Sequence, residues 1–114
     1  MKPKVYIASP YSNGDQIINA KAQYDVFNKI IHTKKLIPFA PLWATFQHFV
    51  YPLPYEMWLE WDFEWVKACD CVLRLPGVSS GADAEVKTAL DNGKLVFYTL
   101  EELFDHYKIE HESN

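Results

Sequence analysis

The chain alternates short apolar runs with longer stretches in which apolar residues recur at helical spacing. Runs of β-branched and aromatic residues bounded by turn residues are typical of strands, whereas recurrence at three and four residues is typical of amphipathic helices. The runs that predict strands are residues 4–8, 36–40, 70–75 and 94–98. The segments that predict helices are residues 15–32, 55–68, 82–91 and 100–107.

Strands that alternate with helices favour an α/β fold, because a parallel sheet needs helical crossovers between its strands. Right-handed crossovers leave 2-1-3-4 as the favoured strand order. Pro38 lies within the second predicted strand and indicates a sheet edge, where a missing N–H is tolerated. We therefore expect a single-domain, flavodoxin-like or Rossmann-like three-layer sandwich over residues 1–114, with a parallel sheet of four to five strands.

Residues 41–54 form a segment rich in aromatic residues and proline, with a short helical turn expected near residues 43–49. Long loops inside a compact domain are often functional, and aromatic walls suit flat ligands such as nucleobases. Trp43 is the candidate ligand contact in this segment. An alternative stays equally open: the rings cover the core or fill a subunit interface.

In the order 2-1-3-4 the first and third strands are neighbours, so the loops that follow them meet at the switch point where open α/β sheets bind ligands. These loops offer hydroxyls and backbone N–H groups for an anionic or sugar-like ligand, and a glycine permits its close approach. The residues predicted to bind substrate there are Ser9, Pro10 and Tyr11 after the first strand, and Ser79, Ser80 and Gly81 after the third.

Two carboxylates occupy helical positions that a solvated face does not explain. Glu85 shares a stripe with Ala82 and Ala89, and Asp62 lies between apolar positions of the preceding helix. A carboxylate in apolar surroundings either takes up a proton or finds partners, which is how functional sites tune nucleophiles and acids. The alternative for Glu85 is a partly exposed acid in the first helical turn, stabilised by the helix dipole.

Other residues near this turn suggest structural roles. Asp83 follows Ser80 by three residues, which predicts a variant of the capping box at the start of the helix. Cys69 and Cys71 are too close in sequence for an ordinary disulfide and are expected to be buried free thiols. The four histidines show no metal-ligand spacing, so we expect neither a metal nor a cofactor.

Charge and hydropathy narrow the choice of partner. The chain has 114 residues, a formal net charge of −4 and a single arginine, Arg74, which argues against binding of a nucleic-acid polymer. Its apolar runs are far shorter than a membrane span, and the start Met1-Lys2-Pro3-Lys4 leads into a strand rather than a signal-peptide core. We expect a cytoplasmic protein that binds a small molecule and no membrane.

Three motifs, YIASPY near the start, DFEWVKACDCVL in the middle and SSGADAEVKTAL after the third strand, resemble those of the nucleoside 2-deoxyribosyltransferase superfamily. This superfamily includes 2′-deoxynucleoside 5′-phosphate N-hydrolases. The resemblance covers roughly residues 4–98, in the same order. It implies that Glu85 is the nucleophile on the sugar, that Asp62 is the acid/base for the nucleobase, and that Tyr6 orients the glutamate.

The same resemblance implies that Ser79 helps to hold the 5′ end of the sugar. The aromatic density of residues 41–65 predicts a homodimer or larger homo-oligomer, and the resemblance implies that a neighbouring subunit often completes the site. The chain departs from the family at Asp83, where members commonly have glycine, and its first loop lacks the arginine that the hydrolases place near the phosphate.

The function expected from these residues is N-glycosidic bond cleavage or transfer on a nucleoside or nucleoside 5′-monophosphate. A carboxylate beneath the sugar stabilises positive charge on the ring or forms a covalent adduct, while an acid beside the base helps it to leave. The alternative is a non-catalytic nucleotide-binding or sensing domain on the same fold, which the departure at Asp83 favours. A flavin-binding, flavodoxin-like protein is a third and more remote possibility.

Overall fold

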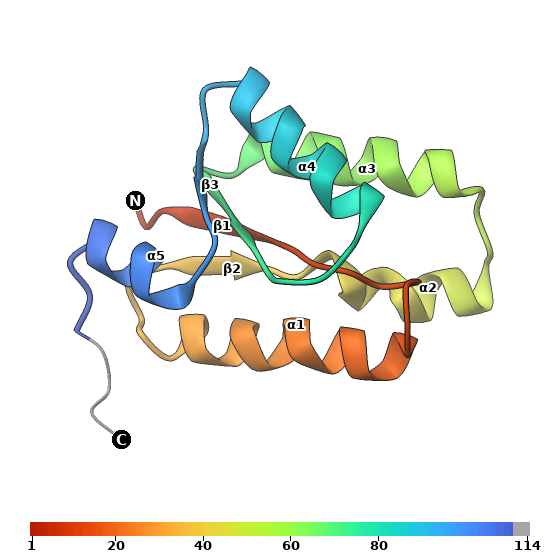
Figure 1. Ribbon diagram of the computed structural model, residues 1–114, viewed down its shortest axis with the longest axis horizontal. Helices are drawn as coiled ribbons and strands as arrows, with labels where there is room; N and C mark the ends of the chain where they lie inside the picture. The colour runs from red at the N-terminus through yellow and green to blue at the C-terminus, as the bar shows by residue number, and fades with distance from the viewer. Residues whose placement is uncertain (111–114) are drawn as a thin grey trace.

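A four-stranded parallel sheet forms the centre of the protein (Figure 1). The computed structural model describes residues 1–110. Within that range the strand order is β2-β1-β3-β4, as the sequence predicts. The strands are β1 (Lys4–Ala8), β2 (Ile37–Phe39), β3 (Cys71–Arg74) and β4 (Leu95–Phe97).

Helices cover both faces of this sheet and give the three layers of a Rossmann-like α/β fold. The long helix α1 packs with α5 on one face, and α3 packs with α4 on the other (Figure 1). A short 3-10 helix and α2 occupy the segment that was expected to be a loop with a helical turn. The helices are α1 (Gln16–Ile31), η1 (Pro41–Ala44), α2 (Thr45–Val50), α3 (Tyr55–Ala68), α4 (Ser80–Asp91) and α5 (Leu100–His106).

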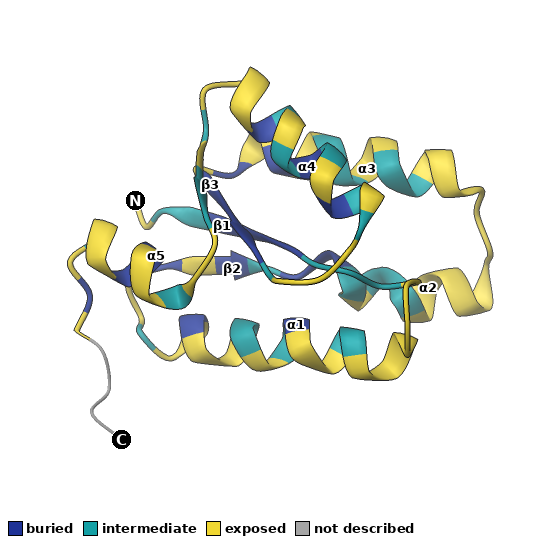
Figure 2. Ribbon diagram, viewed as in Figure 1, coloured by how far each residue is buried: buried dark blue, intermediate teal, exposed yellow. Residues whose placement is uncertain are grey.

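The side chains of β1 alternate between two hydrophobic clusters, one on each face of the sheet. Val5 and Ile7 pack toward α1 and α5, whereas Tyr6 and Ala8 pack toward α3 and α4. All four are fully buried, and β1 and β3 form the buried centre of the sheet in Figure 2. The register of the first strand therefore sends the Tyr6 side chain into the layer that carries both candidate carboxylates.

Local sequence signals explain where several elements begin and end. The Asp15 carboxylate caps α1 by accepting from the N–H groups of Ile17 and Ile18, and the Thr99 hydroxyl caps α5. Gly93 follows α4 with a φ of +71°, a conformation that favours glycine after a helix. The strand that contains Pro38 lies at the sheet edge, as predicted.

The start of α4 differs from the prediction. The helix begins at Ser80, and its N-cap is Ser79, whose hydroxyl accepts from the Ala82 N–H at 3.1 Å. Ser79 rather than Ser80 is the N-cap because its backbone is extended, with φ −161° and ψ 110°, as an N-cap requires. The predicted capping box between Ser80 and Asp83 is therefore wrong.

Two further sequence features have structural counterparts. Cys69 and Cys71 are buried free thiols, as predicted, and they pack in the clusters on opposite faces of the sheet. None of the helices within residues 1–110 combines the length and apolar character needed to cross a membrane.

Candidate functional site

The loops after β1 and β3 are fastened to each other at the carboxyl ends of the two strands. The Asn13 side-chain amide donates to the Val78 carbonyl at 3.0 Å. Gly77 has a φ of +118°, and a Cβ atom there would lie 2.7 Å from Cγ of Pro10. Only glycine allows this close approach without displacing the proline, so the two loops form one unit at the switch point of the sheet.

Arg74, at the end of β3, fastens the same turn to α4. Its guanidinium donates to the carbonyls of Leu75 and Gly77 and to the Asp83 carboxylate, the last at 3.0 Å. The Arg74 side chain is 9% exposed, so its guanidinium is largely shielded from water, whereas the Asp83 side chain is 72% exposed. Asp83 is thus the partner of a buried arginine, which corrects its predicted role in a cap.

A cavity of about 690 Å³ lies against these two loops and is also lined by residues of η1, α2 and α3. It contains both candidate carboxylates, Asp62 and Glu85. Of the residues predicted to bind substrate, those that line it are Ser9, Tyr11, Ser79, Ser80 and Gly81.

Two predicted substrate contacts lie outside the lining of this cavity. Pro10 packs against Gly77 and so holds the two loops together. Trp43 stacks on Tyr24 with 4.8 Å between ring centroids and meets Phe27 edge to face. Pro10 and Trp43 thus make packing contacts, with the turn after β3 and with α1 respectively, and Trp43 remains 61% exposed.

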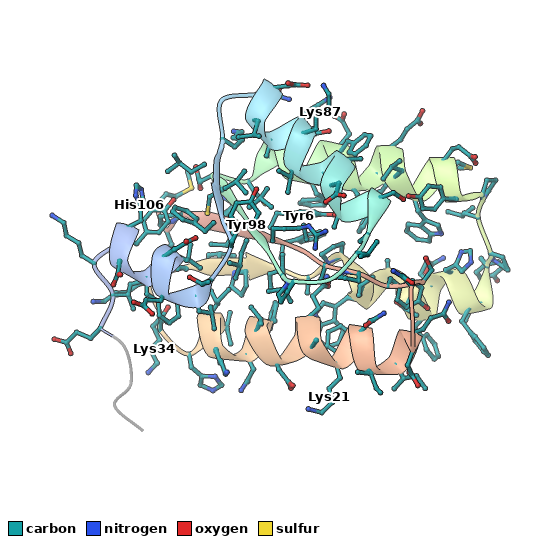
Figure 3. All side chains as sticks on the ribbon, in the orientation of Figure 1. Tyr6, Lys21, Lys34, Lys87, Tyr98 and His106 are labelled. Carbon is teal, nitrogen blue, oxygen red and sulfur yellow. The ribbon has the colours of Figure 1, made fainter. Side chains whose placement is uncertain are left out.

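Tyr6 and Glu85 form a buried pair between the sheet and α4, where Figure 3 labels Tyr6. The tyrosine hydroxyl donates to Oε2 of Glu85 at 2.5 Å. Glu85 is only 5% exposed, so its alternative assignment as a partly exposed first-turn acid is wrong. Burial, and then the negative charge of Glu85, raise the pKa of Tyr6 well above its usual value, so the tyrosine keeps its proton and acts as a donor.

Asp62 reaches the same pair from α3. Burial raises the pKa of Asp62 to about 6, although its hydrogen bonds with Glu85 and Tyr6 act in the opposite direction. Burial, followed by the charge of Asp62, raises the pKa of Glu85 well above its usual value, while the Tyr6 hydroxyl and Arg74 lower it. The carboxyls of buried Glu85 and half-buried Asp62 titrate together, so the pair keeps a proton to higher pH than free carboxyls do.

Gln23 is a site residue that the sequence analysis missed. Its side chain is fully buried, and its amide donates to the Ile7 carbonyl at 3.1 Å and to Oγ of Ser9 at 2.8 Å. Its oxygen accepts from the Leu42 N–H at 2.9 Å. Gln23 thus joins the end of β1 to η1, and its helical spacing from Val26 and Ile30 is the signal that would have found it.

His48 and Trp58 were also missed as parts of one wall of the cavity. Nδ1 of His48 accepts from the indole N–H of Trp58 at 2.8 Å and from the Leu53 N–H at 3.1 Å. With Nδ1 as an acceptor, the proton of the neutral ring lies on Nε2. These bonds connect α2 to α3 across residues 51–54 and fix the histidine beside the cavity.

Within residues 1–110 no three side chains of His, Cys, Asp or Glu are grouped so that they could hold a metal ion. No known family model matches the sequence, and no curated protein is significantly similar to it. The fold and the site therefore define a Rossmann-like α/β protein with a tyrosine and two carboxyl groups at the switch point of its sheet. Its membership of the resembled superfamily stays a prediction.

Proposed function

We propose that the protein cleaves the N-glycosidic bond of a nucleoside or nucleoside 5′-monophosphate, by hydrolysis or by transfer of the sugar to another base. The observation that carries this proposal is the meeting of three groups from separate elements: Asp62 and Glu85 line one cavity, and the buried Tyr6 hydroxyl donates to Glu85. A carboxylate held by a neutral donor, next to a second carboxyl that carries a proton, is the set of groups that glycosidic chemistry needs.

In the first step an oxygen of Glu85 forms a bond to the anomeric carbon C1′ as the bond from C1′ to the base nitrogen breaks. The leaving base takes its bonding electron pair and receives a proton from Asp62. In the second step water, or a second base, attacks C1′ and releases Glu85. Asp62 accepts the proton of that nucleophile and returns to its starting state.

Opposing effects act on the proton that the two carboxyls share. Burial and the charge of Asp62 favour a proton on Glu85 in the free protein, whereas the Tyr6 hydroxyl and the charge of Arg74 stabilise its ionised form. We infer that the shared proton resides on Asp62 when a substrate occupies the cavity. Glu85 is then the nucleophile and Asp62 the acid.

The rest of the lining suits the two halves of a nucleoside. Hydroxyls of Ser9, Ser79 and Ser80 can bind sugar hydroxyls, and the rings of Tyr55 and Trp58 offer flat apolar surfaces for a base. Hydrolysis occurs if water reaches the anomeric carbon, and transfer occurs if a second base reaches it first. The assay should therefore measure both products.

The test is to incubate the purified protein with a panel of nucleosides and nucleoside 5′-monophosphates and to measure free base by chromatography. The matched control is Glu85→Gln, which keeps the side-chain shape and an acceptor for Tyr6 but removes the nucleophile. We expect base release by the unmodified protein and a loss of at least about 1,000-fold in the variant. Mass spectrometry of a rapidly quenched reaction should find the sugar attached to Glu85.

Absence of base release for the whole panel, or equal release by Glu85→Gln, would contradict the proposal. Nucleosides that raise the melting temperature of both proteins without base release would select the alternative, a nucleotide-binding or sensing domain. A yellow preparation with a flavin spectrum would select the third possibility. A cytoplasmic location stays a prediction, which fractionation of cells that produce the protein would check.

A further inference from the structure

We propose that the cavity binds the sugar with a neutral 5′-hydroxyl and discriminates against a 5′-phosphate. This inference rests on the proposed N-glycosidic function and narrows its substrate to nucleosides. It is carried by the charge of the groups that line the cavity and by the contacts that keep the nearest cation out of it.

None of the residues from 1–110 that line the cavity is lysine or arginine. Its acidic groups are Asp62 and Glu85, which retain negative charge even when they share one proton. A phosphate monoester brings up to two further negative charges into the same partly enclosed space. Repulsion between like charges is strong where water is partly excluded, so the lining opposes a nucleotide but not an uncharged nucleoside.

The single arginine does not offset this repulsion. Arg74 lies beneath the turn after β3, where two backbone carbonyls and the Asp83 carboxylate occupy its guanidinium. Asp83 therefore offsets part of the charge that Arg74 exerts on Glu85. No lysine of residues 1–110 lines the cavity, and two of them, Lys21 and Lys87, pair with acids on their own helices and lie on the outside of the molecule (Figure 3).

The chain itself takes part of the first turn of α4. The Ser79 hydroxyl accepts from the Ala82 N–H, and the Ser79 carbonyl accepts from the Asp83 N–H. Asp83 adds a carboxylate at the helix end where a phosphate would otherwise be favoured. The groups left for the sugar are neutral: Ser9, for example, accepts from Gln23 and keeps its own proton as a donor to a hydroxyl.

The experiment compares matched pairs, each a 2′-deoxynucleoside and its 5′-monophosphate with the same base, by the kcat/KM of base release at low ionic strength. We expect kcat/KM to be at least about tenfold higher for the nucleoside. Added salt should narrow the difference, because mobile ions screen the repulsion.

Two variants test the electrostatic cause. Val78 lies at the rim of the cavity and is 79% exposed, so Val78→Lys adds a cation there and Val78→Gln adds a neutral side chain of similar length. The lysine variant should reduce the preference for nucleosides by several-fold, and the glutamine variant should leave it unchanged. Cooperative thermal unfolding of both variants verifies that they are folded.

The outcomes separate this inference from the function on which it rests. Equal or better turnover of the monophosphate would overturn the inference and leave the N-glycosidic activity in place. Equal effects of the Val78→Lys and Val78→Gln variants would also overturn it, because charge would then not set the preference. Failure of both substrates to release base would refute the proposed function, and the inference would fall with it.

Discussion

Tyr6 owes its place beneath Glu85 to the alternation of side chains along β1. Its ring packs on Phe39 of the edge strand, with 5.7 Å between centroids, and its hydroxyl is left with the Glu85 carboxylate as acceptor. A donor fixed in this way holds the carboxylate in one orientation and stabilises its charge. Tyr6 is therefore expected to set both the position and the ionisation of Glu85, the proposed nucleophile.

Replacing Tyr6 by phenylalanine tests the role of the hydroxyl, because the ring remains and only the hydrogen-bond donor is lost. We expect the free energy of unfolding to fall by about 1–3 kcal/mol, since Glu85 is left buried without this partner. The acid limb of the pH profile of base release should move to higher pH, because the ionised form of Glu85 loses its donor. Denaturant titration and kcat/KM against pH measure the two effects.

Phe39→Leu is the control for this prediction. It removes the ring contact with Tyr6 but keeps the hydrogen bond to Glu85. Stability should fall without a shift of the pH profile. An unshifted profile in Tyr6→Phe itself would show that the hydroxyl does not govern the ionisation of Glu85.

Asp62 links the site to the stability of the whole chain. Its pKa is raised from 3.8 to about 6 by burial, so the folded state holds a proton that the unfolded state has already released between these values. Stability from this group is full below about pH 4 and is lost as the pH rises through about 6. The loss amounts to as much as about 3 kcal/mol by pH 8.

The Asp62→Asn variant, which has no such charge, should be more stable than the unmodified protein at pH 8 and nearly equal to it at pH 4. Glu60→Gln, an exposed position on the same helix, is the matched control and should leave the pH dependence unchanged. Urea unfolding from pH 4 to 8 makes the comparison. If Asp62→Asn is destabilised equally at pH 4 and pH 8, burial of the Asp62 carboxylate does not raise its pKa in the way described.

At the scale of elements, the site depends on how the turn after β3 is held. Gly77 has a φ of +118° and faces Pro10, whereas Gly93 has a φ of +71° and open space, with no atom within 4 Å of the point that a Cβ would occupy. Both glycines have a positive φ that disfavours other residues, but only at Gly77 would an added Cβ also clash with a neighbouring side chain. Comparing alanine at each position therefore isolates the contact between the two loops.

We expect Gly93→Ala to lower the free energy of unfolding by about 1 kcal/mol, from backbone strain alone. Gly77→Ala should lower it by at least about 2 kcal/mol, because strain and the clash with Pro10 add. It should also reduce kcat/KM, since Pro10 and Gly77 position the walls of the cavity. Equal effects of the two substitutions on stability and activity would show that the loop contact is unimportant.

The elements themselves were predictable because their signals are local. The strand Lys4–Ala8 and the helix Tyr55–Ala68 have the bounds that periodicity predicts. The stripe that contains Glu85 was also predictable, since spacing of three and four residues on a helix fixes which side chains share a face. The proposed roles of Glu85, Asp62 and Tyr6 came instead from the family resemblance.

Partners that depend on tertiary approach were not predictable. Two adjacent serines compete for the N-cap of α4, and the sequence does not decide between Ser79 and Ser80, so Asp83 was assigned to a cap instead of to Arg74. The contacts of Trp43 with Tyr24 and Phe27 were likewise not predictable, because aromatic residues in an aperiodic segment do not reveal the surface on which they pack.

At the scale of the whole molecule, α2 leaves an apolar surface uncovered in the single chain. Phe46 and Phe49 stack on each other with 6.3 Å between centroids, yet Phe49 is 81% exposed. Monomeric proteins rarely expose aromatic residues in groups beside a cavity, so this surface agrees with the expected homodimer or larger homo-oligomer. A second copy bound to this surface would also cover α2, which forms one wall of the cavity.

We therefore expect light scattering to give a mass of at least two chains at micromolar concentration, and Phe49→Ser to shift the protein toward monomer. Leu90→Ser, at an exposed apolar position near the far end of α4, is the control and should leave the mass unchanged. Because an apolar contact of this kind is removed with little change inside each chain, the Phe49→Ser monomer should keep its thermal unfolding cooperative. The kcat/KM of this monomer shows whether the neighbouring chain contributes to the site, because a large loss of kcat/KM in a folded monomer means that it does. If light scattering finds the unmodified protein to be a monomer, the expectation of self-association is contradicted.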